Sequence, residues 1–300
     1  MSLFSTRFFQ DKINCQEIEE TIESALRTAA QDPYLLYTFM QRYTHFNAYA
    51  SAVIARLASS IGLSRYLFKN PELLVIEESD KGLEIAAQVM AAAADEGTDQ
   101  NPVHRFLAQL LLKNVGSYAN LSIEERNRLA VPPQWLKEIT DALVLNYAGV
   151  PGNLEALVKA MGFHVASEIL GDREYALIDK VIRYEYKDMG FDHYLKTEAK
   201  PIKLQGHSYD PWCWVVIHGK HNGSAAECEH VACAIQALNL TVRYCNEPQE
   251  KLLDWAMNGF QSFVTLQQKL FYEIHRENLE LIGQSQRLAT SQSLPLASAS

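Results

Sequence analysis

Hydrophobic residues recur at helical spacing through most of this chain. From Asp32 and Pro33, a pair that suits a helix start, apolar side chains follow the 3.6-residue period as far as Leu57. This pattern predicts one amphipathic helix of about seven turns. The sequence contains no internal repeat and no convincing pair of strands. The chain is therefore predicted to be all-α.

Prolines, glycines and capping residues divide the rest of the sequence into further helices. Ser122 and Glu125 match a capping box, which marks the start of a short helix. Residues 190–210 are the least helical stretch and are predicted to form a loop or lid. The other predicted helices cover roughly 81–94, 101–116, 133–147, 151–170, 172–186, 223–240 and 248–282.

Composition favours one folded domain and argues against two kinds of partner. The chain has 300 residues, of which 48% are hydrophobic and 21% charged, so it can bury a sizeable core. We predict a single helical domain over residues 1–285 and a disordered tail, small and polar, at 286–300. The net charge of −9 argues against nucleic acid and against an anionic membrane surface. No apolar run approaches the ~20 residues that span a bilayer.

Cysteine usage and the N-terminal residues indicate a reducing compartment. The five cysteines are scattered, and none of them form a Cys-x-x-Cys pair, so no disulfide framework is expected. The first residues lack the apolar core and cleavage site of a secretory signal. We therefore predict a cytoplasmic protein. Cys228 and Cys233 flank His230, but free cysteines are more often small buried hydrophobes than ligands.

A single Glu-x-x-His pair is the first sign of function. Glu227 and His230 lie one turn apart on a predicted helix, so both side chains can aim at one point. An oxygen and a nitrogen ligand at this spacing hold pairs of iron or manganese ions inside helical bundles. The second copy of the pair that the ferritin-like pattern requires is missing. Alone, the pair is also common on solvated helices.

Other acids and histidines near apolar segments extend this pattern. Glu96 ends one predicted helix and His104 begins the next, while Glu168 follows His164 by four residues on an apolar face. A charge on an apolar face needs a partner, and a metal cation would be one. Taken singly, the acids also fit solvated surface positions, His104 fits a residue of a first helical turn, and His164 fits a satisfied core histidine.

A histidine from the segment WCWVVIHGKH is expected to join them. Either His218 or His221 could reach Glu227 and His230, and His218 is preferred because its neighbours are more apolar. The sequence contains no G-x-S-x-G elbow, P-loop or G-x-G-x-x-G, which disfavours hydrolase, nucleotidase and dinucleotide-binding functions. Four histidines lack a carboxylate at ligand-like spacing on an apolar face: His45, His193, His207 and His275.

The order of these segments resembles the heme-oxygenase-like di-iron oxidases and oxygenases, particularly proteins similar to the chlamydial protein associating with death domains. The resemblance covers roughly residues 32–240, and rests on the aromatic helix, DEG…PVHRFL, GFHVASEILG and the run that ends in Glu-x-x-His. It implies an all-α, single-domain helical bundle of the heme-oxygenase-like type. It also implies two Fe(II) ions per chain, although the same ligands suit manganese. A homodimer is the family expectation.

Carried over by position, the resemblance implies a set of metal ligands. The chain departs from the family at Gly223, where a histidine is expected four residues before Glu227. His218 or His221 would have to supply that sixth ligand. Glu227 itself stands where the family usually has aspartate, which gives a longer arm. The residues that match ligand positions are Glu96, His104, Glu168, Glu227 and His230.

The family's chemistry supplies the leading functional hypothesis. Its members use Fe(II) and O2 for N-oxygenation, C–C cleavage, decarboxylation and a self-sacrificing synthesis from one of their own tyrosines. The resemblance therefore implies an iron-dependent oxidoreductase that acts on a small amine, amino acid or fatty-acid-like molecule. His164 would orient the ligands. Tyr43 and Tyr49 would border the cavity, either as an aromatic wall together with Phe46 or in a radical-bearing or sacrificial role.

Two other functions stay open at this point. The same fold hosts metal-free enzymes of a thiaminase-like and a quinone-forming oxidase type, although no cysteine here lies in a segment that resembles the thiaminase site. The third hypothesis is a binding or interaction protein that keeps the fold without a working site, which Gly223 favours. Convergence of the predicted ligands would distinguish the metal-dependent enzyme from both.

Overall fold

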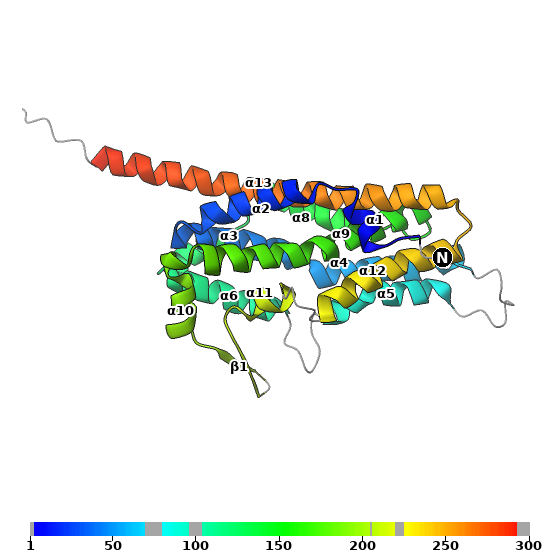
Figure 1. Cartoon of the computed structure of the whole chain (residues 1–300), viewed down its shortest axis with the longest axis horizontal. Helices are drawn as coiled ribbons and strands as arrows, with labels where there is room; N and C mark the ends of the chain where they lie inside the picture. Colours follow the sequence, from blue (N-terminus) through cyan, green and yellow to red (C-terminus); the bar gives the residue numbers. More distant parts are fainter. Residues whose placement is uncertain (1–2, 70–79, 96–103, 205, 220–224, 293–300) are drawn as a thin grey trace, which may run out of the picture.

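Capping residues set several of the helix starts that the sequence predicts. The computed structural model describes residues 3–69, 80–95, 104–204, 206–219 and 225–292. The chain is all-α, 80% helical, and packs as a single helical body (Figure 1). Asp32 accepts hydrogen bonds from the backbone N–H groups of Tyr34 and Leu35, and the predicted capping box of Ser122 and Glu125 is present.

The helices follow one another with short connections and one small hairpin. The α-helices are α1 (Thr6–Gln10), α2 (Cys15–Ala29), α3 (Pro33–Asn47), α4 (Ala50–Gly62), α5 (Lys81–Asp95), α6 (His104–Tyr118), α7 (Ile123–Ala130), α8 (Gln134–Tyr147), α9 (Leu154–Asp179), α10 (Phe191–Thr197), α11 (Cys213–His218), α12 (Ala225–Tyr244) and α13 (Gln249–Gln292). Shorter elements are the 3₁₀ turns η1 (Arg65–Leu67) and η3 (Lys187–Met189), the π-helix η2 (Lys180–Glu185), and the antiparallel strands β1 (Ile202–Leu204) and β2 (His207–Tyr209).

The helix predicted from Asp32 to Leu57 is in fact two helices. α3 ends at Asn47 and α4 begins at Ala50. Asn47 turns its side-chain amide back onto its own helix, donating to the Tyr43 carbonyl oxygen at 3.0 Å. Side-chain bonds of this kind compete with the backbone ladder and are frequent where helices end. The hydrophobic period continues across the break, so periodicity alone could not locate it.

The two helices predicted at 151–170 and 172–186 are instead one. α9 runs from Leu154 to Asp179 without a break and continues as the π-helix η2. Gly171, where the break was expected, lies inside α9 and lines a cavity. Packing by the surrounding helices overrides the low helix propensity of glycine. As a result, Glu168 and Glu174 lie on the same helix.

Two further predictions about the ends and loops were wrong. The predicted loop at 190–210 contains α10 and the β1–β2 hairpin, and α1 and α2 lie in a stretch for which no element was predicted. α13 continues to Gln292, so residues 286–292 of the predicted disordered tail are helical. This part of α13 extends beyond the body in Figure 1. Most of its residues are good helix formers, and it continues a helix that is already formed within the body.

α9 is the central helix of the body. It packs against α2, α4, α8, α11, α12 and α13. Every residue from Ala160 to Ala166 is buried, so this part of the helix is covered all round. Side chains at its surface therefore either join the apolar core or need a polar partner from a neighbouring helix.

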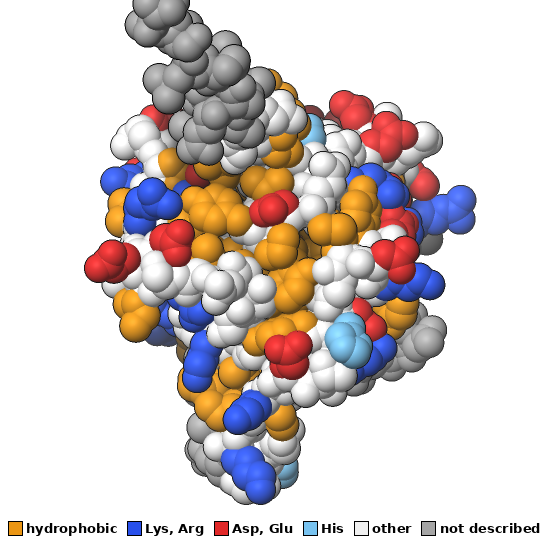
Figure 2. All heavy atoms as spheres, turned by 90° about the vertical axis from the view of Figure 1, so that its left-hand side faces the viewer, with side chains coloured by type: hydrophobic (Ala, Val, Ile, Leu, Met, Phe, Trp, Pro, Cys, Tyr) orange, Lys and Arg blue, Asp and Glu red, His pale blue; other side chains and the backbone are white. Residues whose placement is uncertain are grey.

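The outer surface is mixed in character. The end of the body that faces the viewer in Figure 2 shows acidic and basic side chains on either side of a hydrophobic stretch. No described helix is both long and apolar enough to cross a membrane.

Two glycines allow α9 and α13 to approach closely. A Cβ atom on Gly162 would collide with the Ala256 carbonyl oxygen, and one on Gly259 would collide with the Lys159 carbonyl oxygen. Both obstacles are backbone atoms, which cannot swing aside as a side chain could. The two helices can therefore cross this closely only if both positions are glycine, whose side chain is a single hydrogen atom.

We expect Gly162→Ala and Gly259→Ala each to lower the free energy of unfolding by about 1–3 kcal/mol or more, because the helices must separate. The control is Gly283→Ala, since a Cβ at that helical position meets nothing within 4 Å. This control should be neutral or stabilise by up to about 1 kcal/mol. Urea denaturation measures all three, and equal effects of all three substitutions would contradict the close approach.

Candidate functional site

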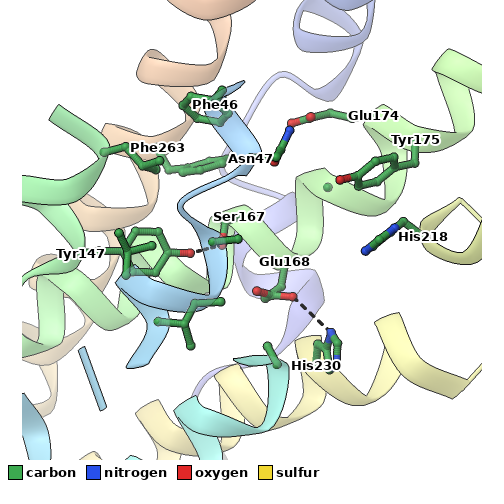
Figure 3. Close-up of a pocket in the computed structure, with 16 residues that line it drawn as sticks. Phe46, Asn47, Tyr147, Ser167, Glu168, Glu174, Tyr175, His218, His230 and Phe263 are labelled. Atoms are coloured by element: carbon green, nitrogen blue, oxygen red, sulfur yellow. Dashed lines mark hydrogen bonds and ion pairs between the residues drawn. The ribbon is translucent and has the colours of Figure 1, made fainter. Parts of the chain in front are cut away.

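A cavity of about 100 Å³ lies between α9 and the helices that cover it. This volume holds several water molecules or a small ligand. Figure 3 shows its labelled side chains, which come from α3, α8, α9, α11, α12 and α13. The polar and aromatic residues that line it are Phe46, Asn47, Tyr147, Ser167, Glu168, Glu174, Tyr175, His218, His230 and Phe263.

Glu168 brings two of the predicted histidines together. Its Oε1 lies 3.4 Å from His164 Nδ1, one turn earlier on α9, and its Oε2 lies 3.7 Å from His230 Nδ1 on α12. Figure 3 shows Glu168 and His230 pointing toward each other. The Glu168 side chain is 11% exposed, so these contacts are only weakly screened by solvent. The predicted proximity of Glu168 and His230 is therefore present in the fold.

His104 and His218 form a second pair. His218 Nε2 lies 3.2 Å from His104 Nδ1, and His218 Nδ1 lies 2.6 Å from the Trp214 carbonyl oxygen. Because a carbonyl oxygen only accepts, the proton of a neutral His218 is on Nδ1 and its Nε2 carries a lone pair. Metal-binding histidines show the same arrangement, with the second ring nitrogen donating to a carbonyl.

The short helix α11 holds His218 firmly against α9. The indole Nε1 of Trp212 donates to Asp179 Oδ1 at 2.7 Å. The ring of Tyr175 stacks on the His218 imidazole, with 4.5 Å between ring centroids. Gly219 lies so close to α9 that a Cβ there would meet the Tyr175 carbonyl carbon at 2.9 Å. These contacts fix the direction in which His218 presents Nε2.

His164 is a neutral, buried imidazole. It is 1% exposed, and its Nδ1 also lies 3.3 Å from the Tyr147 hydroxyl, which in turn contacts Ser167 Oγ at 2.5 Å. Burial first, and the charge of His230 second, lower the pKa of His164 to about 3. Its Nε2 has no hydrogen-bond partner among the described residues. The predicted role of His164 as an orienting neighbour of Glu168 fits these contacts.

The two predicted tyrosines differ in position. Tyr43 is fully buried, and its hydroxyl donates to Glu174 Oε2 at 2.7 Å. Tyr49 lies in the break between α3 and α4, half-buried against His45, and is not among the residues that line the cavity. Tyr43 is not among the lining residues either, so the prediction that both tyrosines border the cavity was wrong. Phe46, which was predicted to form the wall with them, does line the cavity.

Three predicted ligands lie wholly or partly outside the part of the chain that the structure describes. Glu96 and His221 lie outside the described residues, and Glu227 lies on α12 one turn before His230 with a side chain that is not described. Within the described ranges, no group of at least three His, Cys, Asp or Glu side chains is placed to hold an ion. The described donors form two neighbouring sets rather than one closed shell.

Glu174 is the residue that sequence reasoning missed. It is 3% exposed, and its carboxylate accepts from Tyr43 and from Gln267 Nε2 on α13. Burial raises the pKa of Glu174 to about 7, and the two hydrogen bonds act in the opposite direction. The expected break at Gly171 had placed Glu174 on a different helix. Helical spacing could have revealed it, because Glu174 shares one face of α9 with the other polar residues of the site. That face contains residues 164, 167, 168, 171, 174 and 175.

No family model matches this sequence, and no curated protein matches it. The chemistry of the site therefore rests on its own geometry.

The buried Glu174 predicts a pH-dependent stability. Its pKa is about 7 in the fold against an ordinary 4.5, so between these values the native state binds the extra proton. The free energy of unfolding should therefore fall as pH rises through this window. Glutamine at this position cannot ionise. The free energy of unfolding of Glu174→Gln, relative to that of the wild type, should therefore rise by on the order of 3 kcal/mol from acid to alkaline pH.

Chemical denaturation of both proteins at several pH values measures this difference. The control is Glu155→Gln, the same substitution on an exposed residue of α9 that pairs with Lys159. The difference between its free energy of unfolding and that of the wild type should change far less with pH. A difference between Glu174→Gln and the wild type that is constant across the pH range would contradict the buried carboxyl.

Proposed function

We propose that this protein is a non-heme, Fe(II)- and O2-dependent oxidase or oxygenase of the heme-oxygenase-like type, acting on a small molecule in the α9 cavity. The observation that supports it is a set of nitrogen and oxygen donors from separate helices at one buried cavity. Glu168, His218 and His230 line that cavity, and His104 Nδ1 contacts His218 Nε2. Such donors suit iron, and they suit manganese as well.

The spacing within the histidine pair fits a shared ion. Two nitrogen ligands about 2.1 Å from one metal lie about 3.0–3.4 Å apart at the angles of octahedral and tetrahedral sites. The distance between His218 Nε2 and His104 Nδ1 is 3.2 Å. The backbone carbonyl of Trp214 already keeps the His218 proton on the other ring nitrogen. The residues that would hold iron are His104, Glu168, His218 and His230, with Glu96 and Glu227 as the predicted remainder.

Iron held by such ligands, with positions left open, supplies O2 activation when it is bound. The chain's own residues do the rest. Phe46 and Phe263 form apolar walls that limit the entry of water. His164, kept neutral by burial, positions the Glu168 carboxylate without adding a positive charge beside the donors. The hydroxyl of Tyr147 supports His164 from α8.

Anaerobic loading with Fe(II), removal of excess metal and measurement of bound iron test the proposal. The wild type should retain up to about two ions per chain. Glu168→Ala and His230→Ala should each lose most of this iron, because they remove donors from the cavity. His193→Ala changes an exposed histidine of α10 and should bind iron like the wild type.

Consumption of O2 by the Fe(II) form against small metabolites then identifies a substrate. A wild type that retains almost no iron, with the three variants indistinguishable from it, would reject the proposal.

A second candidate function is a metal-free binding protein. The observation that favours it is that the described donors already pair with one another, Glu168 with His164 and His230, and His104 with His218. The same loading experiment separates the two functions. A folded wild type without iron or O2 consumption would support the binding protein.

A further inference from the structure

One end of the cavity is built around Glu174 and differs from the end that holds Glu168 and His230. We call it the Glu174 corner: Glu174 and Asn47, which line the cavity, and Tyr43 and Gln267, which support Glu174. Glu168 and Glu174 are six residues apart on α9, which separates them by about 9 Å along the helix axis. Figure 3 shows Glu174 on the far side of Ser167 from His230.

In the Glu174 corner each donor group already makes a hydrogen bond to the protein, and acceptor capacity is left over. The Tyr43 hydroxyl and Gln267 Nε2 each donate to a different oxygen of Glu174, and Asn47 Nδ2 donates to the Tyr43 carbonyl. A carboxylate offers about four lone-pair directions, so capacity remains on Glu174. Gln267 Oε1 is fully buried and has no partner among the described residues. The complementary group carries several N–H donors.

The charge of the cavity selects the same kind of group. Among its described lining residues there are two carboxylates, Glu168 and Glu174, and no lysine or arginine. The described contacts of Glu174 are with neutral donors, and its neighbour Arg173 pairs with Glu19 instead. A buried carboxylate without a cation is costly, and a cationic ligand would remove that cost. The same cost of burying the charge raises the pKa of Glu174 to about 7.

The walls beside the Glu174 corner also favour a cation. Phe46 and Tyr175 line the cavity with aromatic rings, whose faces attract positive charge. Glu168 already has imidazole neighbours at the other end. Glu174 is therefore the carboxylate that is left for a ligand.

We propose that the Glu174 corner binds the protonated amine of the substrate, so that the substrate is an amine held at one end while the part to be oxidised lies toward Glu168. An ammonium group brings up to three N–H donors to the free acceptors of Glu174 and Gln267. The oxidation in this statement rests on the proposed function, whereas the binding of the amine requires no metal. A substrate whose only charged group is a carboxylate would meet two like charges and be excluded.

Calorimetric titration of the metal-free, chelator-treated protein tests the inference with three probes that share a ring: benzylamine, benzyl alcohol and benzoate. The wild type should bind benzylamine about tenfold or more tightly than benzyl alcohol, and benzoate least, because charge-assisted hydrogen bonds are the stronger kind. Glu174→Gln should lose the preference for benzylamine. Circular dichroism checks that the variant is folded.

Two further variants make the result specific to the corner. Tyr43→Phe removes a hydrogen bond that lowers the pKa of Glu174, so it should weaken the preference for benzylamine near neutral pH and regain it as the pH is raised. Glu155→Gln, exposed on the same helix, should keep the full preference at both pH values. Equal affinities of the wild type for the three probes, weak binding of all of them, or a Glu174→Gln variant that still prefers benzylamine would each overturn the inference.

The outcome is independent of the iron measurement. A wild type that prefers benzylamine but binds no iron overturns only the proposed oxidase. A wild type that binds iron through Glu168 and His230 but shows no preference for benzylamine overturns only the amine subsite.

Discussion

The polar face of α9 is the constraint on which the rest of the structure depends. The middle of α9 is buried among other helices, so each polar group on its buried face must find a partner there or be neutral. His164 meets Tyr147 of α8, Glu168 meets His230 of α12, and Glu174 meets Gln267 of α13. One face of one helix thereby fixes how several other helices sit around it. Such a network stabilises the fold when every member has its partner, and losing one member leaves a buried polar group unpaired, which destabilises the fold.

The sequence predicted the positions of helices better than their continuity. Caps and prolines act locally, so the start of α3 at Pro33 and the capping box at Ser122 were correct. The break after Asn47 and the continuity of α9 through Gly171 depend on contacts with other helices. A local pattern contains no information about those contacts. For the same reason it missed the β1–β2 hairpin, whose strands are three residues each.

The candidate site shows the same division between local and distant information. Glu168 and His164 are one turn apart, so their contact follows from spacing. The contact between His104 and His218 joins residues 114 positions apart in the sequence, so no local spacing could predict it, and it was expected only as part of the hypothetical ligand set. Glu174 was missed because its partners Tyr43 and Gln267 are also distant in sequence. A buried acid on an otherwise apolar helix becomes meaningful only once the residue it faces is known.

Two glutamates on one helix have environments that suit different tasks. Glu168 faces imidazole nitrogens, which can share a cation with it, whereas Glu174 faces a hydroxyl and an amide, which stabilise a charge without neutralising it. Environments that separate two carboxyl groups in this way are a usual means of assigning them different roles. The first environment is the one that the proposed metal ligand needs, and the second is the one that the proposed ammonium site needs. Because both lie on a buried helix, the distance between the two ends of the cavity is set by α9 itself and does not depend on a mobile loop.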